Sequence, residues 1–281
     1  MKKLNKPDMD AEKVFLTCIS KVKSPTLKKR LNSITFAIKE YSEKFDEKAI
    51  KSELYTLSEH DSVNNVVTKD EMIKVYTSRM VDRKQPGRNI YDKLLLMPRH
   101  GICPLCGQRT VATLDHHLTK DKYPMLAVTP NNLIAACFDC NKVKHTIIPS
   151  KAEEQTLHPY YDDITTEYWL HAKVIQDSTV SLMFFVKALE DCDRLLSARI
   201  QYHFRIFELG ALYAAHSGSE LVNIKENLES LYDQGGSNLV REQLNENAKS
   251  YGAANKNSWQ TAMYRGLAEN NWFCEGGFKN V

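Results

Sequence analysis

The sequence lacks the segments by which a chain crosses or leaves a membrane. None of its apolar runs reaches the roughly 18 residues that a membrane-spanning helix needs. Its N-terminus begins Met1-Lys2-Lys3-Leu4, but the apolar stretch of a signal peptide does not follow. We therefore expect a cytoplasmic protein that has no membrane partner.

The chain also lacks internal repeats, low-complexity tracts and the G-x-x-x-x-G-K-[ST] phosphate-binding loop. Its 281 residues, 42% of them hydrophobic, suffice for a real core in one large or two small domains. The net charge of +3 is uneven, because residues 1–150 carry 26 Lys and Arg against 17 Asp and Glu, and residues 151–281 carry 12 against 18. The basic part is suited to binding a polyanion such as nucleic acid, and the acidic part is not. An ordinary solvated surface also explains both charge excesses.

Cysteine is used seven times, and four of these residues form two Cys-x-x-Cys pairs separated by 30 residues. An odd count with two close pairs, and no export signal, indicates metal ligands rather than disulfides. Four thiolates at this spacing predict a closed, structural zinc site, with chance or a redox pair as the alternatives. The pairs are Cys103 with Cys106 and Cys137 with Cys140. The scattered Cys18, Cys192 and Cys274 are expected to be buried apolar residues.

Three polar residues lie beside these pairs: Asp115, His116 and Asn141, which directly follows Cys140. A zinc site would draw them together, although an Asp-His dipeptide by itself usually means nothing. His116 is then a suitable general base for activating water. The oxygens of Asp115 and Asn141 are hard ligands, suited to a catalytic Mg²⁺ or Mn²⁺ ion.

The combined motif resembles that of the HNH endonucleases, which have the ββα-metal fold. Its parts are the first Cys-x-x-Cys pair, the sequence Leu114-Asp115-His116-His117-Leu118, the sequence Pro130-Asn131-Asn132-Leu133, and the second pair with Asn141 and Lys144. The resemblance covers residues 103–144. It implies Asp115 and Asn141 as ligands of the catalytic metal, His116 as general base and Asn132 as a brace for the loop before the helix. Lys144 matches a family lysine that contacts a phosphate or supports a ligand.

Two departures from the family motif leave the assignment of the site residues open to alternatives. Many family members have proline three residues after the catalytic histidine, where this chain has Thr119. His117 offers a second register, in which His116 is the ligand and His117 the base. We favour the register of Asp115 and His116, with His117 in a positioning role. Asn131 is the alternative to Asn132.

The expected fold is α+β and mostly helical, with a small zinc-bound ββα-metal insert between helical segments. We expect helical residues 1–98, an HNH region at 99–150 and helical residues 151–281. Capping signals predict helices after Asp10, from Pro25 to about Tyr41, and after Thr68, whose capping box uses Glu71. A strand that reaches His116 is expected within 109–118, and another strand at 181–186. Amphipathic helices are expected at 193–216, 218–233, 237–251 and 258–270.

The leading hypothesis is a metal-dependent nuclease that cuts nucleic acid, with DNA favoured over RNA. HNH proteins of this size with helical flanks resemble effectors of anti-phage systems such as Septu and some retrons, which act with a separate ATPase. The main alternative is a zinc module that binds nucleic acid or protein without catalysis. The segment from His158 to Asp163 borders the active site or forms a packed turn.

Overall fold

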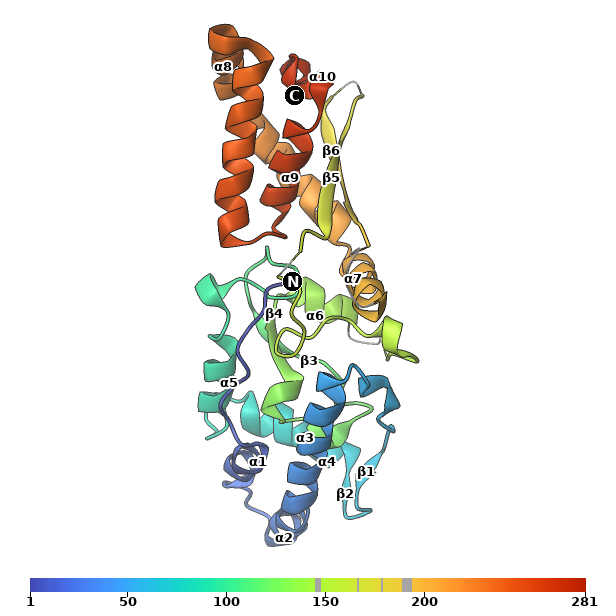
Figure 1. Cartoon of the computed structure of the whole chain (residues 1–281). Helices are drawn as coiled ribbons and strands as arrows, with labels where there is room; N and C mark the ends of the chain where they lie inside the picture. The colour runs from blue at the N-terminus through green and yellow to red at the C-terminus, as the bar shows by residue number, and fades with distance from the viewer. Residues whose placement is uncertain (145–147, 166, 178, 189–193) are drawn as a thin grey trace. The chain divides into compact units, whose positions relative to one another are not determined.

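The computed structural model describes residues 1–144, 148–165, 167–177, 179–188 and 194–281 (Figure 1). It divides into two compact units, unit 1 from Met1 to Asp163 and unit 2 from Ile164 to Val281. Helices predominate, and each of the three small sheets is an antiparallel strand pair. The α+β, mostly helical prediction is confirmed at this level. In the described part of the chain, no helix is long and apolar enough to cross a membrane.

Unit 1 begins with helices that its capping residues define. In α1 (Ala11–Ile19), the Asp10 carboxylate accepts a hydrogen bond from the Lys13 amide at 2.8 Å. Both bonds of the expected capping box are present at Thr68, which precedes α4 (Lys69–Val75). These side chains satisfy amides that a helix leaves without partners in its first turn, so the sequence signals place the helix starts correctly.

The helix expected from Pro25 to Tyr41 is two helices, α2 (Pro25–Ser33) and α3 (Thr35–Ile50). The break lies at Ile34, which has φ −101° and ψ 0° and is fully buried. Leu31, Ile34 and Ile38, before, at and after the break, are all buried in the core. The expected single helix is therefore wrong at this residue.

The motif region folds as a hairpin followed by a helix. Strand β3 (Thr113–His116) pairs with β4 (Leu133–Ala136), and α6 (Phe138–Lys144) follows at once. In the register, Asp115 lies opposite Ile134, and His116 opposite Leu133. Strand β3 reaches His116 as expected but begins only at Thr113, and Thr110 instead forms an isolated bridge with Ile102.

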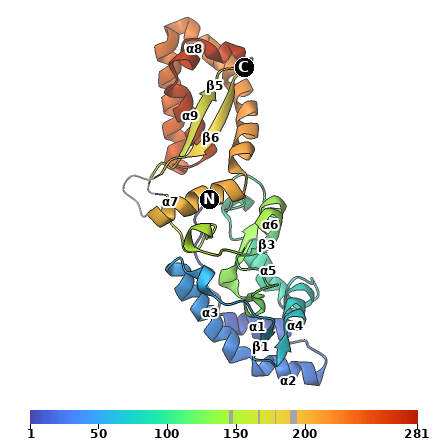
Figure 2. The ribbon, with the colours of Figure 1, turned by 90° about the vertical axis from the view of Figure 1, so that its right-hand side faces the viewer.

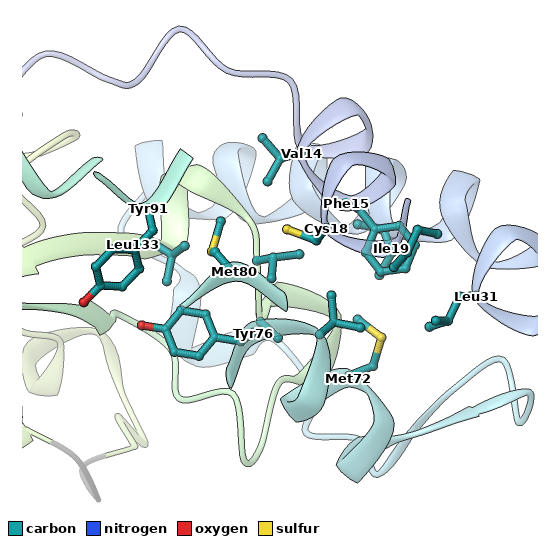
Figure 3. Packing of buried hydrophobic residues seen from close by; sticks show 14 of the residues in the cluster. Val14, Phe15, Cys18, Ile19, Leu31, Met72, Tyr76, Met80, Tyr91 and Leu133 are labelled. Carbon is teal, nitrogen blue, oxygen red and sulfur yellow. The ribbon is translucent and has the colours of Figure 1, made fainter. Parts of the chain in front are cut away.

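One hydrophobic core joins the hairpin to the helices before it. Apolar side chains of α1, α4 and α5 (Arg88–Leu95) pack with residues of β3 and β4. Figure 3 shows Tyr76, Met80 and Tyr91 in this cluster together with Leu133 from the hairpin. The expected regions 1–98 and 99–150 thus contribute to a common core. A strand pair of this size is not stable by itself in water, so it needs this support.

Unit 2 pairs a second hairpin with helices (Figure 2). Strand β6 (Ser181–Val186) has the expected bounds, and its partner β5 (Leu170–Ile175) was not expected. The helices are α7 (Arg194–Ile206), α8 (Leu209–Ala254), α9 (Trp259–Ala268) and α10 (Asn271–Cys274).

The helices of unit 2 divide differently from the expectation. The stretch expected as one helix at 193–216 is interrupted at Glu208, which has a left-handed φ of 50°; residue 193 lies outside the described residues. Helix α8 instead includes the two segments expected at 218–233 and 237–251, with a kink at Gly236. Ser258 caps α9 as expected, since its hydroxyl accepts from the Thr261 amide at 3.1 Å.

In the remainder of unit 1, a strand pair β1 (Ser62–Val63) and β2 (Val67–Thr68) precedes α4. A π-helical turn follows α4 and delivers Tyr76 toward the motif hairpin, where its hydroxyl donates to the Leu114 carbonyl at 3.4 Å.

Candidate functional site

The four cysteines of the two pairs form a single buried cluster. The sulfur atoms of all four lie within 4.8 Å of one another, although they come from segments 30 residues apart. Four sulfurs around one zinc ion at about 2.3 Å from the metal are separated by less than about 4 Å, so a small closure of the cluster accommodates the ion. The cluster can therefore bind a metal such as zinc. Its members are Cys103, Cys106, Cys137 and Cys140.

Backbone amides are directed at the sulfurs of both pairs. The Arg109 amide donates to Cys106 Sγ at 3.4 Å, and the Cys140 amide donates to Cys137 Sγ at 3.4 Å. The turn of the first pair is closed by Gly107, which has φ +67° and donates to the Cys103 carbonyl at 2.8 Å. Amide donors stabilise thiolate over thiol, which is the form that binds metal.

An ion pair links the two cysteine turns outside the cluster. Arg109 Nε lies 3.0 Å from Asp139 Oδ2, which joins the strand side of the first pair to the start of α6. Both side chains are partly exposed, so this pair contributes little stability by itself.

Asp115 and Lys144 form a buried ion pair beneath the end of β3. The ammonium of Lys144 lies 3.0 Å from Asp115 Oδ2 and donates to the His116 carbonyl at 2.6 Å. The two side chains are only 4% and 5% exposed. The charge of each compensates the burial of the other, and the pair fixes the end of α6 against the strand that carries Asp115 and His116.

The ring of His116 is held by a backbone carbonyl and by a tyrosine. Its Nε2 donates to the Ala127 carbonyl at 2.9 Å, and the Tyr76 ring meets it edge-on with centroids 4.4 Å apart. A carbonyl only accepts, so this bond places the proton of the neutral imidazole on Nε2 and its lone pair on Nδ1. Nδ1 is then the nitrogen that can take a proton.

A pocket of about 200 Å³ opens over these residues. It brings Asp115 and His116 of β3 together with Asn141 of α6, three of the residues that the sequence singles out. The lining is Tyr76, Thr113, Leu114, Asp115, His116, Thr119, Lys120 and Asn141. Carboxylate and amide oxygens are ligands that Mg²⁺ accepts, so the donor set fits a hard divalent cation beside a histidine.

Asn132 is fully buried and connects the two ends of the loop between β3 and β4. Its Oδ1 accepts from the Leu118 amide at 2.7 Å, and its Nδ2 donates to the Leu118 carbonyl at 2.9 Å and to the Leu126 carbonyl at 3.3 Å. Asn131 instead donates to the carboxylate of Asp46 on α3 at 2.8 Å. Of the two adjacent asparagines, Asn132 therefore braces the loop.

His117 lies in a different environment from His116. It lines a cavity of about 10 Å³, and its ring is 4.3 Å from the ring of His158. His158 Nε2 in turn donates to the Asn131 carbonyl at 3.1 Å, and the His158 amide donates to Asp162 at 2.7 Å. The segment from His158 to Asp163 is thus a packed turn that backs the β3–β4 loop.

Some residues of the site were not expected from the sequence. Tyr76 and Lys120 line the pocket, and the Ala127 carbonyl orients His116. Tyr76 is about forty residues before the hairpin, and no spacing rule connects the two. Lys120 directly follows the departure at Thr119, and its Nζ lies 6.0 Å from the Tyr76 ring centroid. A backbone carbonyl has no sequence signal at all.

Comparison with known proteins gives one significant likeness. The chain is 27% identical to "Protein ea31" of Escherichia phage lambda over 224 residues, which is 75% of each chain. No protein-family model matches the chain, and no solved structure matches it.

Proposed function

We propose that the chain is a metal-dependent HNH endonuclease that hydrolyses phosphodiester bonds of nucleic acid, with DNA favoured over RNA as substrate. The observation that carries this proposal is the shared pocket of Asp115, His116 and Asn141 on a β–β–α unit joined to the cysteine cluster. These residues supply a base and two hard oxygen ligands, which is the set that phosphodiester hydrolysis requires.

His116 is the proposed general base. The Ala127 carbonyl holds the ring with Nδ1 as its basic nitrogen, so Nδ1 accepts the proton of the attacking water. The edge of Tyr76 packs against the ring and limits its rotation. A fixed tautomer and orientation place the base without reorganisation during the reaction.

Asp115 and Asn141 are the residues proposed to hold Mg²⁺ or Mn²⁺. When bound, the ion supplies positive charge for the scissile phosphate and the leaving oxygen. The Lys144 ammonium, 3.0 Å from Asp115 Oδ2, compensates the charge of this buried carboxylate and fixes its position at the pocket. Lys144 therefore supports a ligand in this proposal, which favours that role over direct phosphate contact. Lys120, at the pocket, is the better placed cation for a phosphate.

The pocket also supports the register of Asp115 with His116 over the alternative with His117 as base. His116 shares the pocket with the two proposed ligands, whereas His117 lines the cavity on the side of His158. The cysteines are proposed to hold a structural Zn²⁺ that ties β4 and α6 to the loop before β3.

A second candidate is a zinc module that binds nucleic acid or protein without catalysis. The ion pair of Asp115 with Lys144 favours it, because this contact gives the buried carboxylate a structural role. The anti-phage effector role and a partner ATPase are wider proposals, tested by isolating the tagged protein from its native host and identifying what accompanies it.

A plasmid cleavage assay tests the function. Wild-type protein should cut in Mg²⁺ or Mn²⁺ and not in EDTA, and His116→Ala should lower the rate at least about 100-fold while the zinc content stays unchanged. His117→Ala is the matched control and should keep most of the activity. Loss of activity in His117→Ala with retention in His116→Ala would reverse the register. A wild type that binds zinc and nucleic acid but never cuts, with host lysate added as well, would favour the binding module.

A further inference from the structure

The β5–β6 hairpin of unit 2 has two unlike faces. Side chains of one face, including Leu170, Val174 and Phe184, are buried, and α8 and α9 pack in this unit against the two strands (Figure 2). Alternation along a strand places His171 and Lys173 on the opposite face. By the register, their partners across the hairpin are Phe185 and Met183.

Aromatic rings and cations alternate along the second face. The rings of His171 and Phe185 stack with centroids 5.8 Å apart and an angle of 27° between planes. Lys187 Nζ lies 6.0 Å from the Phe185 centroid. Burial lowers the pKa of His171, so at neutral pH this ring contributes a flat surface rather than a charge.

Tyr168, just before β5, adjoins His171 through its backbone. His171 Nε2 donates to the Tyr168 carbonyl at 3.2 Å. The Tyr168 side chain is 41% exposed, and the guanidinium of Arg265 on α9 lies 4.1 Å from its ring centroid. Lys256 Nζ is 5.6 Å from the same centroid. Three rings and the cations beside them therefore gather around the start of β5 and the end of β6.

Three of these cations lie outside the ion pairs of the described residues. Among the residues that the structure describes, Lys173, Lys187 and Arg265 form no ion pair, and Nη1 of Arg265 is buried with no hydrogen-bond acceptor. Unit 2 contains more acidic than basic residues, so the gathering of cations around rings on one face is a local feature. The acidic side chain that acts on His171 is Glu269.

We propose that this aromatic-basic surface binds single-stranded nucleic acid, its rings stacking on bases and its cations contacting phosphates. The surface comprises Tyr168, His171, Lys173, Phe185, Lys187 and Arg265. Exposed rings interleaved with cations are the means by which proteins hold unpaired strands with little sequence preference. Bases in a duplex are already stacked, so a duplex gains only the ionic part. The inference relies on the proposed function for the class of polymer, and not on catalysis.

Binding of a fluorescein-labelled oligothymidylate of about 20 nucleotides to the full chain, followed by fluorescence anisotropy, tests the proposal. All proteins carry His116→Ala, so that no cleavage occurs. Tyr168→Ala should weaken binding about tenfold, and Tyr168→Phe should keep it. Lys173→Gln with Lys187→Gln should weaken binding and reduce the slope of log affinity against log salt by about 1.4.

Two matched controls should bind as the parent does. Phe36→Ala removes a 66% exposed ring from α3 in unit 1, and Lys249→Gln removes a 72% exposed ammonium from α8 in unit 2. Thermal melting of each variant checks that it folds, and the conservative Tyr168→Phe and Lys→Gln changes keep the test valid where Tyr168→Ala does not fold.

Equal affinities for parent, Tyr168→Ala and the double lysine variant would overturn the inference. So would a Tyr168→Ala variant that loses as much affinity for duplex DNA as for the single strand, or polyglutamate that competes as well as oligonucleotide, since each indicates that the surface does not bind by stacking on unpaired bases. A wild type that never cuts a plasmid, combined with the expected binding losses, would contradict the proposed nuclease and leave this binding surface standing.

Discussion

The central hairpins of the two units bury different kinds of group. In unit 1 the hairpin β3–β4 and helix α6 enclose Asp115, His116, Asn132 and Lys144 together with four cysteines. In unit 2 the hairpin β5–β6 buries apolar side chains against α8 and α9 and leaves its polar side chains outward. Buried polar groups are stable only where each is paired. The hairpin of unit 1 therefore fixes polar side chains in the interior, whereas the hairpin of unit 2 leaves them at its surface.

The largest expected difference between the units follows loss of the proposed zinc. Cys137→Ser should unfold the hairpin of unit 1, because structural zinc contributes about 10 kcal/mol or more in small zinc domains, comparable with the whole stability of a domain. Hydrogen exchange should show loss of protection in β3, β4 and α6, and retained protection in β5 and β6. Metal analysis should show loss of the ion.

Cys274→Ala is the matched control, since Cys274 is buried in unit 2 and outside the cluster. It should lower stability by roughly 1 kcal/mol and leave the metal content unchanged. If Cys137→Ser keeps full protection in unit 1, the cluster is not what holds this hairpin together.

Breaking the buried ion pair should have the next largest effect. Lys144→Met leaves the Asp115 carboxylate buried without its ammonium, and should lower the free energy of unfolding by about 3–5 kcal/mol in urea denaturation. Lys142→Met changes an exposed lysine of the same helix and should have almost no effect.

Repeating the urea denaturation with added Mg²⁺ tests whether Asp115 is a metal ligand. If Asp115 is a metal ligand, Mg²⁺ should stabilise Lys144→Met more than the parent, because the ion replaces the lost positive charge. Equal stabilisation of both proteins would contradict Asp115 as a ligand and favour its structural role.

The smallest expected effect concerns the kink in α8 of unit 2. Gly236 has φ 65° and ψ −159°, a conformation that is open almost only to glycine, so Gly236→Ala should cost about 1–3 kcal/mol. Gly218→Ala in the same helix meets open space and should stabilise by about 0.5–1 kcal/mol. Thermal melting of both variants measures these changes in stability. An unchanged melting temperature of Gly236→Ala would mean that α8 can run straight through this residue.

Signals within a few residues of one another predicted structure well. The caps at Asp10, Thr68 and Ser258 and the bounds of β6 follow from such signals. Strand β5 was missed although Leu170, Ala172 and Val174 alternate with His171 and Lys173, which is the pattern of a half-buried strand. The break at Ile34 was missed because Leu31, Ile34 and Ile38 follow the apolar spacing of one continuous helix face.

The sequence by itself determined which residues stand beside one another along the chain: two cysteine pairs, Asp115 next to His116, and Asn141 next to Cys140. Spacing and residue chemistry suffice for these, since ligand type and turn geometry are local. Only the tertiary structure decided that Lys144 pairs with Asp115, that Tyr76 and the Ala127 carbonyl orient His116, and that His117 turns toward His158. Such contacts depend on how strands, loops and helices pack across tens of residues, and no local pattern encodes that packing.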